Sequence, residues 1–105
     1  MTLVVAFNYS SKKEIINTFR EIVKNKKQKK INEEIIKNYL YTSSIPDPDI
    51  LIRTGGYSRI SDFLLWQISY TELYFIKKLW PDFKVNDLKK IIKNYNSIKR
   101  NYGSI

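Results

Sequence analysis

The sequence predicts an α/β fold, in which a mainly parallel sheet is flanked by helices. Short apolar runs at 3–8, 49–53 and 72–76 have the length of buried strands. Longer segments around them carry apolar residues at helical spacing, and turn-forming residues mark the boundaries. Strands that alternate with helices are typical of parallel sheets, because a parallel connection must cross from one end of the sheet to the other.

The first half of the chain is expected to contain one strand and two helices. After the strand at 3–8, Ser10 or Ser11 caps a helix, because a serine hydroxyl accepts a hydrogen bond from a free N–H group at a helix start. A second helix begins at Asn32 and ends before the prolines of segment 43–48. The apolar face of the first helix is expected to pack on the sheet, and it comprises Ile15, Ile16, Phe19, Ile22 and Val23. The second helix presents Ile35, Ile36, Tyr39 and Leu40.

The second half is expected to add two strands and two helices. Strand 49–53 leads into a glycine turn, and a short helix then covers 62–69, with Asp62 as a candidate cap. Strand 72–76 follows, and Asn86 opens a final helix. The apolar stripe of that last helix comprises Leu88, Ile91, Ile92, Tyr95 and Ile98.

Strand 72–76 and its neighbours are rich in aromatic residues. Because side chains alternate along a strand, Leu73 and Phe75 are expected to face opposite to Glu72 and Tyr74. Four aromatic residues of this region are expected to pack in a core rather than to form a ligand box, since leucines interleave with them. They are Trp66, Tyr70, Tyr74 and Trp80.

Composition narrows the class of protein. At 105 residues, with 43% hydrophobic and 14% aromatic residues, the chain is a globular segment rather than a disordered tail. It contains no cysteine, which excludes disulfides and thiolate metal sites. No apolar stretch is long enough to span a bilayer, and the start lacks the pattern of a signal peptide, so a cytoplasmic location is expected.

The charge of the chain is strongly positive, with a formal net value of +9. Such an excess suits nucleic acid, an anionic membrane surface or phosphorylated substrates. The densest basic run, 24–30 (KNKKQKK), lies between the first two predicted helices. We interpret it as a solvated connector or, alternatively, as a peripheral membrane contact. The charges are not arranged for nucleic acid, so no nucleic-acid partner is expected.

The most informative segment follows strand 49–53. Arg53 stands where this strand emerges, and Gly55 and Gly56 then let the backbone turn tightly beside a ligand. Arg59 and Ser61 come directly after the turn. Two guanidinium groups and a hydroxyl fit a diphosphate well, because a guanidinium matches phosphate oxygens with paired N–H donors. The alternative is an ordinary tight turn whose charges face water or pair with carboxylates.

The string DPDILIRTGGYSRISDFLLWQISYTELYFIKKLWPDF at 47–83 resembles the carboxyl-terminal signature of the cis-prenyltransferases, the undecaprenyl diphosphate synthase or isoprenyl transferase family. The segment LVVAFNY at 3–9 is similar to the family's strand before N-Y-G-G-R, and KRNYG at 99–103 to its R-R-F-G ending. The resemblance covers almost the whole chain. The family's amino-terminal D-G-N-G-R-W block is not in this sequence, so residues 1–105 are expected to be the carboxyl-terminal half of one catalytic domain.

The resemblance implies an activity and a set of binding residues. Family members condense isopentenyl diphosphate with an allylic diphosphate to build a cis-polyprenyl diphosphate. Arg53, Arg59 and Ser61, with the backbone of Ile60, match the isopentenyl diphosphate ligands, and Glu72 matches a carboxylate associated with Mg²⁺. No catalytic residue is assigned in this half. The implied partners are the two diphosphates, an amino-terminal half and a second copy in a homodimer. The resemblance implies that the aromatic segment lies at the homodimer interface. It also implies that Glu72 can contribute to the active site of the neighbouring subunit.

Several positions depart from the family pattern. Asp62 stands where the family has asparagine, Tyr57 replaces a common glutamate, and Asn101 replaces a usual arginine. The sequence SSK at 10–12 replaces G-G-R, which removes two flexible positions and one guanidinium. These changes affect residues close to the expected phosphate site.

Three hypotheses about function therefore follow. The favoured hypothesis is that the chain is the isopentenyl diphosphate half of a prenyltransferase. It predicts that the chain is active only together with an amino-terminal half. The second is a non-catalytic remnant or accessory subunit of a prenyltransferase assembly. The third is a small basic protein that binds membrane or nucleic acid through 24–30, which charge reversal in that run would test.

Overall fold

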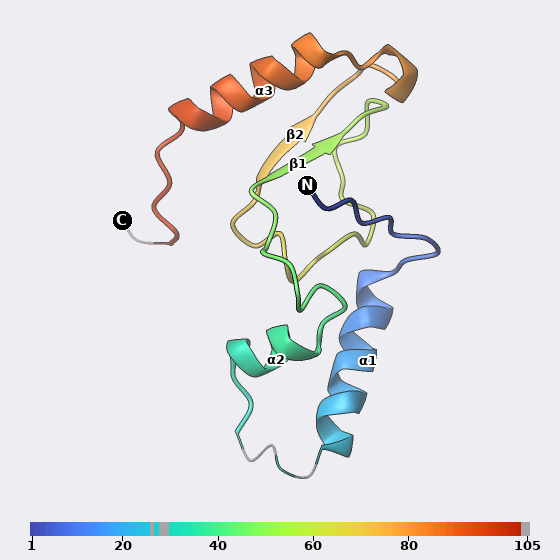
Figure 1. Cartoon of the computed structure of the whole chain (residues 1–105). Helices are drawn as coiled ribbons and strands as arrows, with labels where there is room; N and C mark the ends of the chain where they lie inside the picture. The colour runs from blue at the N-terminus through green and yellow to red at the C-terminus, as the bar shows by residue number, and fades with distance from the viewer. Residues whose placement is uncertain (26, 28–29, 104–105) are drawn as a thin grey trace. The chain divides into compact units, whose positions relative to one another are not determined.

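The computed structural model describes residues 1–25, 27 and 30–103, and the chain divides into two compact units (Figure 1). The first unit comprises 1–47 and 61–66 and contains two helices. The second unit comprises 48–60 and the chain from 67 onward. It contains two strands, a single 3-10 turn and a helix. The α/β class predicted from the sequence is confirmed.

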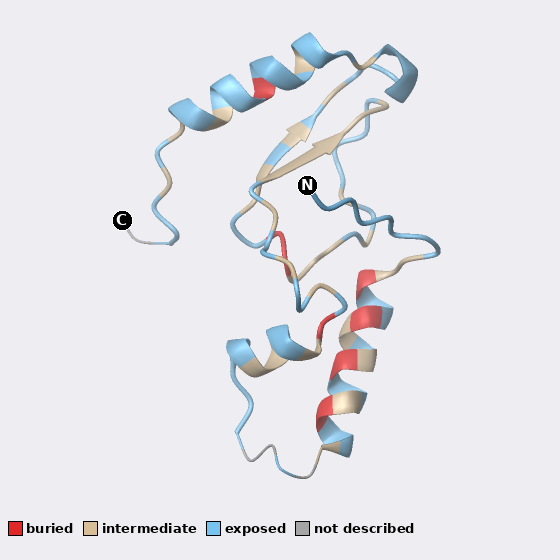
Figure 2. Cartoon of the chain, in the orientation of Figure 1, coloured by how far each residue is buried: buried red, intermediate tan, exposed pale blue. Residues whose placement is uncertain are grey.

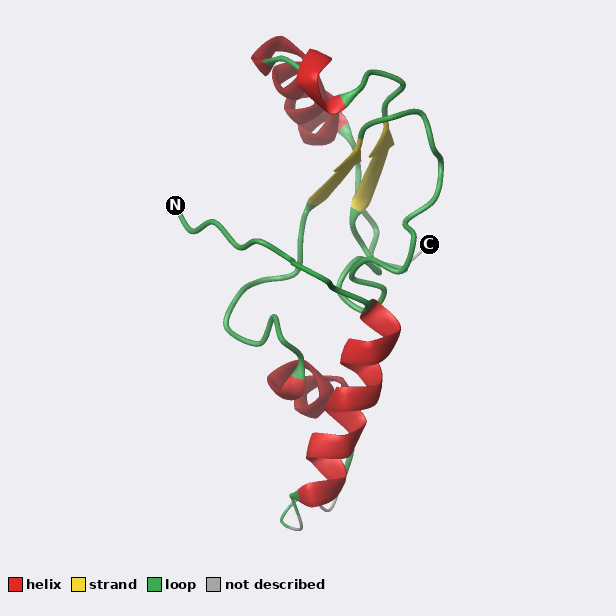
Figure 3. Ribbon diagram, turned by 90° about the vertical axis from the view of Figure 1, so that its right-hand side faces the viewer, coloured by secondary structure: helices red, strands yellow, loops and turns green. Residues whose placement is uncertain are grey.

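Both helices of the first unit begin at a polar cap. Helix α1 (Ser11–Lys24) starts after Ser10, whose Oγ accepts a hydrogen bond from the Lys13 N–H at 3.3 Å. Helix α2 (Glu33–Tyr39) starts after Asn32, whose side chain accepts from the Ile35 N–H at 2.9 Å. The two helices lie side by side (Figures 1 and 3). Of the two predicted caps, Ser10 is confirmed, and the second helix starts at Asn32 as predicted, with Asn32 as its cap.

The buried face of α1 is mainly polar. The buried residues are Ser11, Glu14, Thr18 and Ile22, which follow helical spacing (Figure 2). Their polar groups have partners: the Ser11 Oγ accepts from the Leu65 N–H at 2.8 Å, and the Thr18 Oγ1 donates to the Tyr39 carbonyl at 3.4 Å. Of the predicted apolar face, Ile16, Phe19 and Val23 are exposed, so burial of the whole face is wrong. Packing of this face on the sheet stays a prediction, because α1 and the strands belong to different units.

The apolar run at 3–8 does not form a strand. Its side chains are exposed, Phe7 to 92%, and Asn8 adopts a positive φ of 49°. A strand requires a neighbouring backbone that accepts and donates its hydrogen bonds. No segment within the described residues pairs with 3–8. The prediction of a strand at 3–8 is therefore wrong, because no described segment pairs with it.

The predicted helix at 62–69 is also absent, and turns replace it. Ser61, Asp62 and Leu64 have φ values of 48°, 61° and 50°, which lie in the left-handed region and cannot continue a right-handed helix. Asp62 does act as a cap, but for another helix. Its carboxylate and its carbonyl bind the first turn of α1.

The second unit is built on a parallel strand pair. Strand β1 (Ile50–Arg53) pairs with strand β2 (Glu72–Phe75), and Ile50 lies opposite Glu72 while Arg53 lies opposite Phe75. Figure 3 shows the two strands side by side. In β2, Leu73 and Phe75 are exposed and the alternate residues are half-buried. The predicted parallel pairing and the predicted alternation are confirmed.

Helix α3 (Val85–Ser97) follows the 3-10 turn η1 (Trp80–Asp82). The Asp87 carboxylate accepts from the Lys84 N–H at 2.8 Å, which satisfies a free donor at the helix start. The helix is joined to β2 by the Tyr74 hydroxyl, which donates to the Asn94 Oδ1 at 2.6 Å. The predicted helix is confirmed, one residue earlier than expected, but Ile91 alone of its predicted apolar stripe is buried.

The aromatic residues are less buried than the sequence predicted. Tyr70 and Trp80 are 62% and 73% exposed, so core packing is wrong for these two rings. Each of them contacts another ring instead: Tyr70 lies 5.5 Å from Tyr102, and Trp80 stacks at 6.0 Å on Phe83. No strand or helix among the described residues covers them.

The basic run 24–30 is only partly described. Residues 26, 28 and 29 lie outside the described residues, so its interpretation as a connector or as a membrane contact stays a prediction. None of the helices in the described part of the chain combines the length and the apolar character needed to cross a bilayer.

Candidate functional site

The glycine loop after β1 is fixed by backbone hydrogen bonds. The Gly55 N–H donates to the Lys78 carbonyl at 2.8 Å, and the Gly56 N–H donates to the Ile76 carbonyl at 3.0 Å. The two glycines have φ values of 97° and 86°, a conformation that residues with a side chain rarely adopt. The loop is therefore held against the chain that follows β2, and its direction depends on glycine.

Arg53 and Arg59 are brought together across this loop. The Arg53 Nη1 donates a hydrogen bond to the Arg59 carbonyl. Both guanidinium groups also lie over the ring of Tyr57, with the Arg53 Cζ 5.5 Å and the Arg59 Cζ 4.4 Å from the ring centroid. Arg53 is half-buried, while Tyr57 and Arg59 are exposed. The structure therefore joins two of the predicted phosphate ligands into one cluster.

Sequence reasoning missed the part that Tyr57 plays in this cluster. It marked Tyr57 only as a departure from the family pattern. A signal was present, because the spacing R-x-x-x-Y-x-R at 53–59 places an aromatic ring between two cations. Aromatic rings attract cations through the negative face of their π-system.

Ile60 and Ser61 follow the arginine cluster in the chain. Ile60 is half-buried and belongs to the second unit, as do both arginines. Ser61 is exposed and is the first residue of segment 61–66, which belongs to the first unit. The grouping of Ser61 with the arginines around one phosphate therefore stays a prediction.

Glu72 lies at the opposite end of the strand pair from Arg53. It is the first residue of β2 and pairs with Ile50, whereas Arg53 ends β1 and pairs with Phe75. Along the strand direction Arg53 and Glu72 are therefore three residues apart, which corresponds to about 10 Å. The second unit therefore does not bring the predicted metal ligand and the predicted phosphate ligands together.

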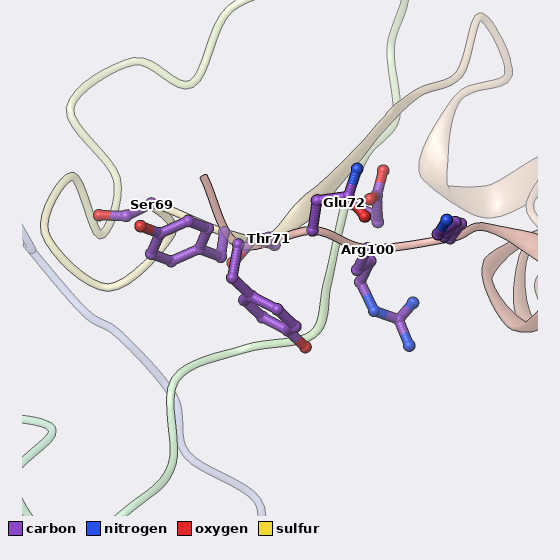
Figure 4. Close-up of a pocket in the computed structure, with 8 residues that line it drawn as sticks. Ser69, Thr71, Glu72 and Arg100 are labelled. Carbon is purple, nitrogen blue, oxygen red and sulfur yellow. The ribbon is translucent and has the colours of Figure 1, made fainter. Parts of the chain in front are cut away.

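Glu72 lines a separate, open cavity of about 290 Å³ (Figure 4). Lys99 and Arg100 also line this cavity, so its wall carries both negative and positive side chains. The Arg100 guanidinium is held by Tyr95: its Cζ lies 3.9 Å from the ring centroid, and its Nη1 donates to the Tyr95 carbonyl at 3.3 Å. Partial burial, and then a hydrogen bond with Asp49, raise the pKa of the Tyr95 phenol, although Arg100 opposes this. The lining residues are Ser69, Tyr70, Thr71, Glu72, Lys99, Arg100, Asn101 and Tyr102.

The residues around Glu72 do not form a complete metal site. The described part of the chain holds no group of three or more histidine, cysteine, aspartate or glutamate residues that could bind an ion. Magnesium usually retains several waters and takes phosphate oxygens as further ligands. Glu72 fits the role of one contributing carboxylate, and the remaining ligands would have to come from water, from phosphate or from another polypeptide.

Comparison with known proteins gives one consistent result. A family model described as undecaprenyl diphosphate synthase matches residues 1–103. The isoprenyl transferase of Chlamydia trachomatis is 52% identical over 108 residues, which cover 98% of this chain and 43% of that protein. The isoprenyl transferase of Thermotoga maritima is 45% identical, with 100% of this chain and 46% of that protein covered.

Solved structures agree with this result. The structure of a probable undecaprenyl diphosphate synthase from Campylobacter jejuni has a TM-score of 0.84 at 34% identity, covering 94% of this chain and 46% of that one. Lavandulyl diphosphate synthase from Lavandula x intermedia, solved in complex with dimethylallyl diphosphate, has a TM-score of 0.85 at 33% identity, covering 91% of this chain and 44% of that one. The chain thus spans less than half the length of these relatives, and it belongs to the undecaprenyl diphosphate synthase family of prenyltransferases.

Proposed function

We propose that this chain supplies the isopentenyl diphosphate site of an isoprenyl transferase. In this proposal the assembled enzyme condenses isopentenyl diphosphate with an allylic diphosphate and yields a cis-polyprenyl diphosphate. The observation that carries the proposal is the cluster of Arg53, Tyr57 and Arg59 at the carboxyl end of β1, in a chain of this family. The carboxyl end of a parallel strand is the edge at which open α/β sheets bind ligands.

The chemistry requires control of negative charge. The double bond of isopentenyl diphosphate attacks the first carbon of the allylic diphosphate, the carbon–oxygen bond to inorganic diphosphate breaks, and a proton is then lost. Two diphosphates must approach each other while one of them leaves. Arg53 and Arg59 would bind the diphosphate of the nucleophile through N–H donors, and the Ile60 backbone and the Ser61 hydroxyl would add further contacts.

Glu72 would serve as a metal-associated carboxylate of the assembled enzyme. Mg²⁺, when bound, would neutralise phosphate oxygens as the leaving group departs. Because Glu72 lies at the other end of the strand pair from Arg53, we propose that it contributes to the site of a second copy in a homodimer. We propose that an amino-terminal half supplies the rest of the allylic site, because the chain matches only 43–46% of the length of its relatives.

The direct test is transfer of radiolabelled isopentenyl diphosphate to farnesyl diphosphate in the presence of Mg²⁺. The chain is assayed alone and after mixing with the amino-terminal half of a family member. Product formed only in the mixture is the expected result. Product from the chain alone would overturn the need for a second half.

Absence of product in both assays has a different meaning. If the chain is folded by circular dichroism and two matched halves of the family member are active together, the proposed enzymatic function is wrong. A non-catalytic accessory subunit would then be the better description.

A further inference from the structure

We propose that Tyr57 is a positioning residue that holds Arg53 and Arg59 as one preorganised pair for a diphosphate. The inference rests on the proposed function and adds to it a residue that makes no hydrogen bond to phosphate itself. Its basis is the contact of both guanidinium groups with one ring, at 5.5 Å and 4.4 Å from the centroid.

The Tyr57 ring reduces the electrostatic repulsion between the two arginines of the cluster. Two guanidinium groups repel each other, and Arg59 is an exposed side chain with many accessible rotamers. The negative face of a tyrosine ring attracts each cation, so contact with Tyr57 offsets part of the repulsion and limits the rotamers before a ligand arrives. When the side chains are already ordered, they lose less conformational entropy on binding a ligand.

The contact with Tyr57 does not itself occupy N–H donors of either arginine. A guanidinium carries its N–H donors in its own plane, and attraction to a π-face does not require a directed N–H donor. A carboxylate at position 57 would instead accept from those donors and compete with phosphate for them. An aromatic ring is thus suited to hold the two arginines without neutralising them.

The backbone fixes the position of the ring. Gly55 and Gly56 donate hydrogen bonds to the Lys78 and Ile76 carbonyls, so the residue that follows them starts from a defined place. The Arg53 Nη1 donates to the Arg59 carbonyl, and this bond closes the loop that contains Tyr57. Backbone and ring contacts therefore act together on the same two side chains.

The test compares Tyr57→Leu with Tyr57→Phe, using inorganic pyrophosphate as the probe and isothermal titration calorimetry on the full chain. Tyr57→Leu removes the ring, and we expect it to weaken binding about five- to tenfold. Tyr57→Phe keeps the ring and should bind close to wild type. Tyr41→Leu is a matched control, because Tyr41 is similarly exposed, at 60% against 53% for Tyr57, and lies in the first unit.

A ligand-free measurement tests the geometry itself. In NMR spectra, ring currents from position 57 should shift the Arg59 Nε–H resonance in wild type and in Tyr57→Phe. Tyr57→Leu should abolish this shift. A purely structural role for Tyr57 would instead disturb amide resonances throughout the second unit.

Each outcome bears on a separate claim. If Arg53→Ala weakens pyrophosphate binding but Tyr57→Leu does not, the inference about Tyr57 is overturned and the proposed site remains. If Tyr57→Phe binds as weakly as Tyr57→Leu, the hydroxyl rather than the ring is responsible, which also overturns it. If the folded wild-type chain does not bind pyrophosphate, the proposed diphosphate site fails and the inference fails with it.

Discussion

Asp62 binds Ser10 across 52 positions of sequence: its Oδ2 accepts a hydrogen bond from the Ser10 Oγ at 2.6 Å. The Asp62 Oδ1 accepts from the Lys12 N–H at 2.9 Å, and its carbonyl accepts from the Ser11 N–H, also at 2.9 Å. These bonds satisfy donors that a helix start would otherwise leave free. The family pattern has G-G-R and asparagine at the corresponding places, so here the two departures combine into one cap for α1.

Asp62 should make stability depend on acid pH. The hydrogen bond from Ser10, and then the N–H and charge of Lys12, lower the pKa of Asp62. Because the folded pKa lies below the unfolded value of about 3.9, the stabilisation is fully present above that value and is lost as pH falls through the folded pKa. Urea unfolding between about pH 5 and pH 2 should therefore show a shallower loss of stability for Asp62→Asn than for wild type. Asp82→Asn, in the exposed turn η1, is the control, and equal acid sensitivity of Asp62→Asn and wild type would contradict the prediction.

Glu14 should be important for the stability of the first unit. Its side chain is fully buried, and it accepts hydrogen bonds from the Tyr41 N–H at 2.8 Å and from the Tyr9 hydroxyl. Glu14→Ala removes the acceptor of both part-buried hydrogen bonds, and we expect it to lower the free energy of unfolding by about 1–3 kcal/mol. Glu14→Gln keeps an acceptor oxygen and should cost less. In the same urea experiment Glu21→Ala, which removes an exposed ion pair with Lys24, should change stability by less than about 0.5 kcal/mol.

Tyr9 should ionise at unusually high pH. Burial, and next its hydrogen bond to Glu14, raise the pKa of the Tyr9 phenol to about 12. The neutral phenol is thus favoured in the folded chain, and its contribution to stability is complete below the unfolded pKa of about 10 and lost as pH rises toward the folded value. An ultraviolet titration of phenolate should show a late component that Tyr9→Phe removes and Tyr41→Phe retains. Identical titrations of Tyr9→Phe and wild type would disprove this assignment.

Gly55 should resist substitution for reasons of backbone conformation alone. A Cβ added at Gly55 would meet no atom within 4 Å, but its φ is 97°. Gly55→Ala should therefore lower the free energy of unfolding by about 1–2 kcal/mol, through strain and not through a clash. Ser58→Ala, in the same exposed loop, serves as the reference in thermal or urea unfolding. A neutral Gly55→Ala would show that the loop relaxes to another conformation.

Arg53 and Glu72 should both be required for turnover in the assembled enzyme. Under the proposed function, Arg53→Ala removes a guanidinium that would bind diphosphate, and Glu72→Ala removes a carboxylate that would associate with the metal. Each change should lower the rate of isopentenyl transfer at least about a hundredfold, the scale for one preorganised charge-stabilising group. Arg53→Lys should not restore the rate, because an ammonium lacks the paired donors of a guanidinium. Lys89→Ala, an exposed lysine on α3, controls for loss of positive charge, and full turnover in both site variants would remove the assignment.

The features that depend on neighbours along the chain could be predicted from the amino-acid sequence. The capped start of α1, the start of the second helix at Asn32, the parallel strands and helix α3 were all predicted, because capping residues and apolar periodicity act over a few positions. The motif string at 47–83 predicted family membership for the same reason, since the residues that form the loop after β1 are contiguous.

Which side chains are buried, and which distant groups form hydrogen bonds, depends on the tertiary structure. Segment 61–66 forms turns rather than a helix, and it binds α1 through Asp62 and through the Leu65 N–H, which donates to Ser11. Those partners lie more than fifty positions away, so local propensity could not predict them. The same holds for Glu72 and Arg53, whose separation follows from the register of β1 on β2. Burial and pairing depend on contacts between distant segments, whereas propensity and periodicity report only on adjacent residues.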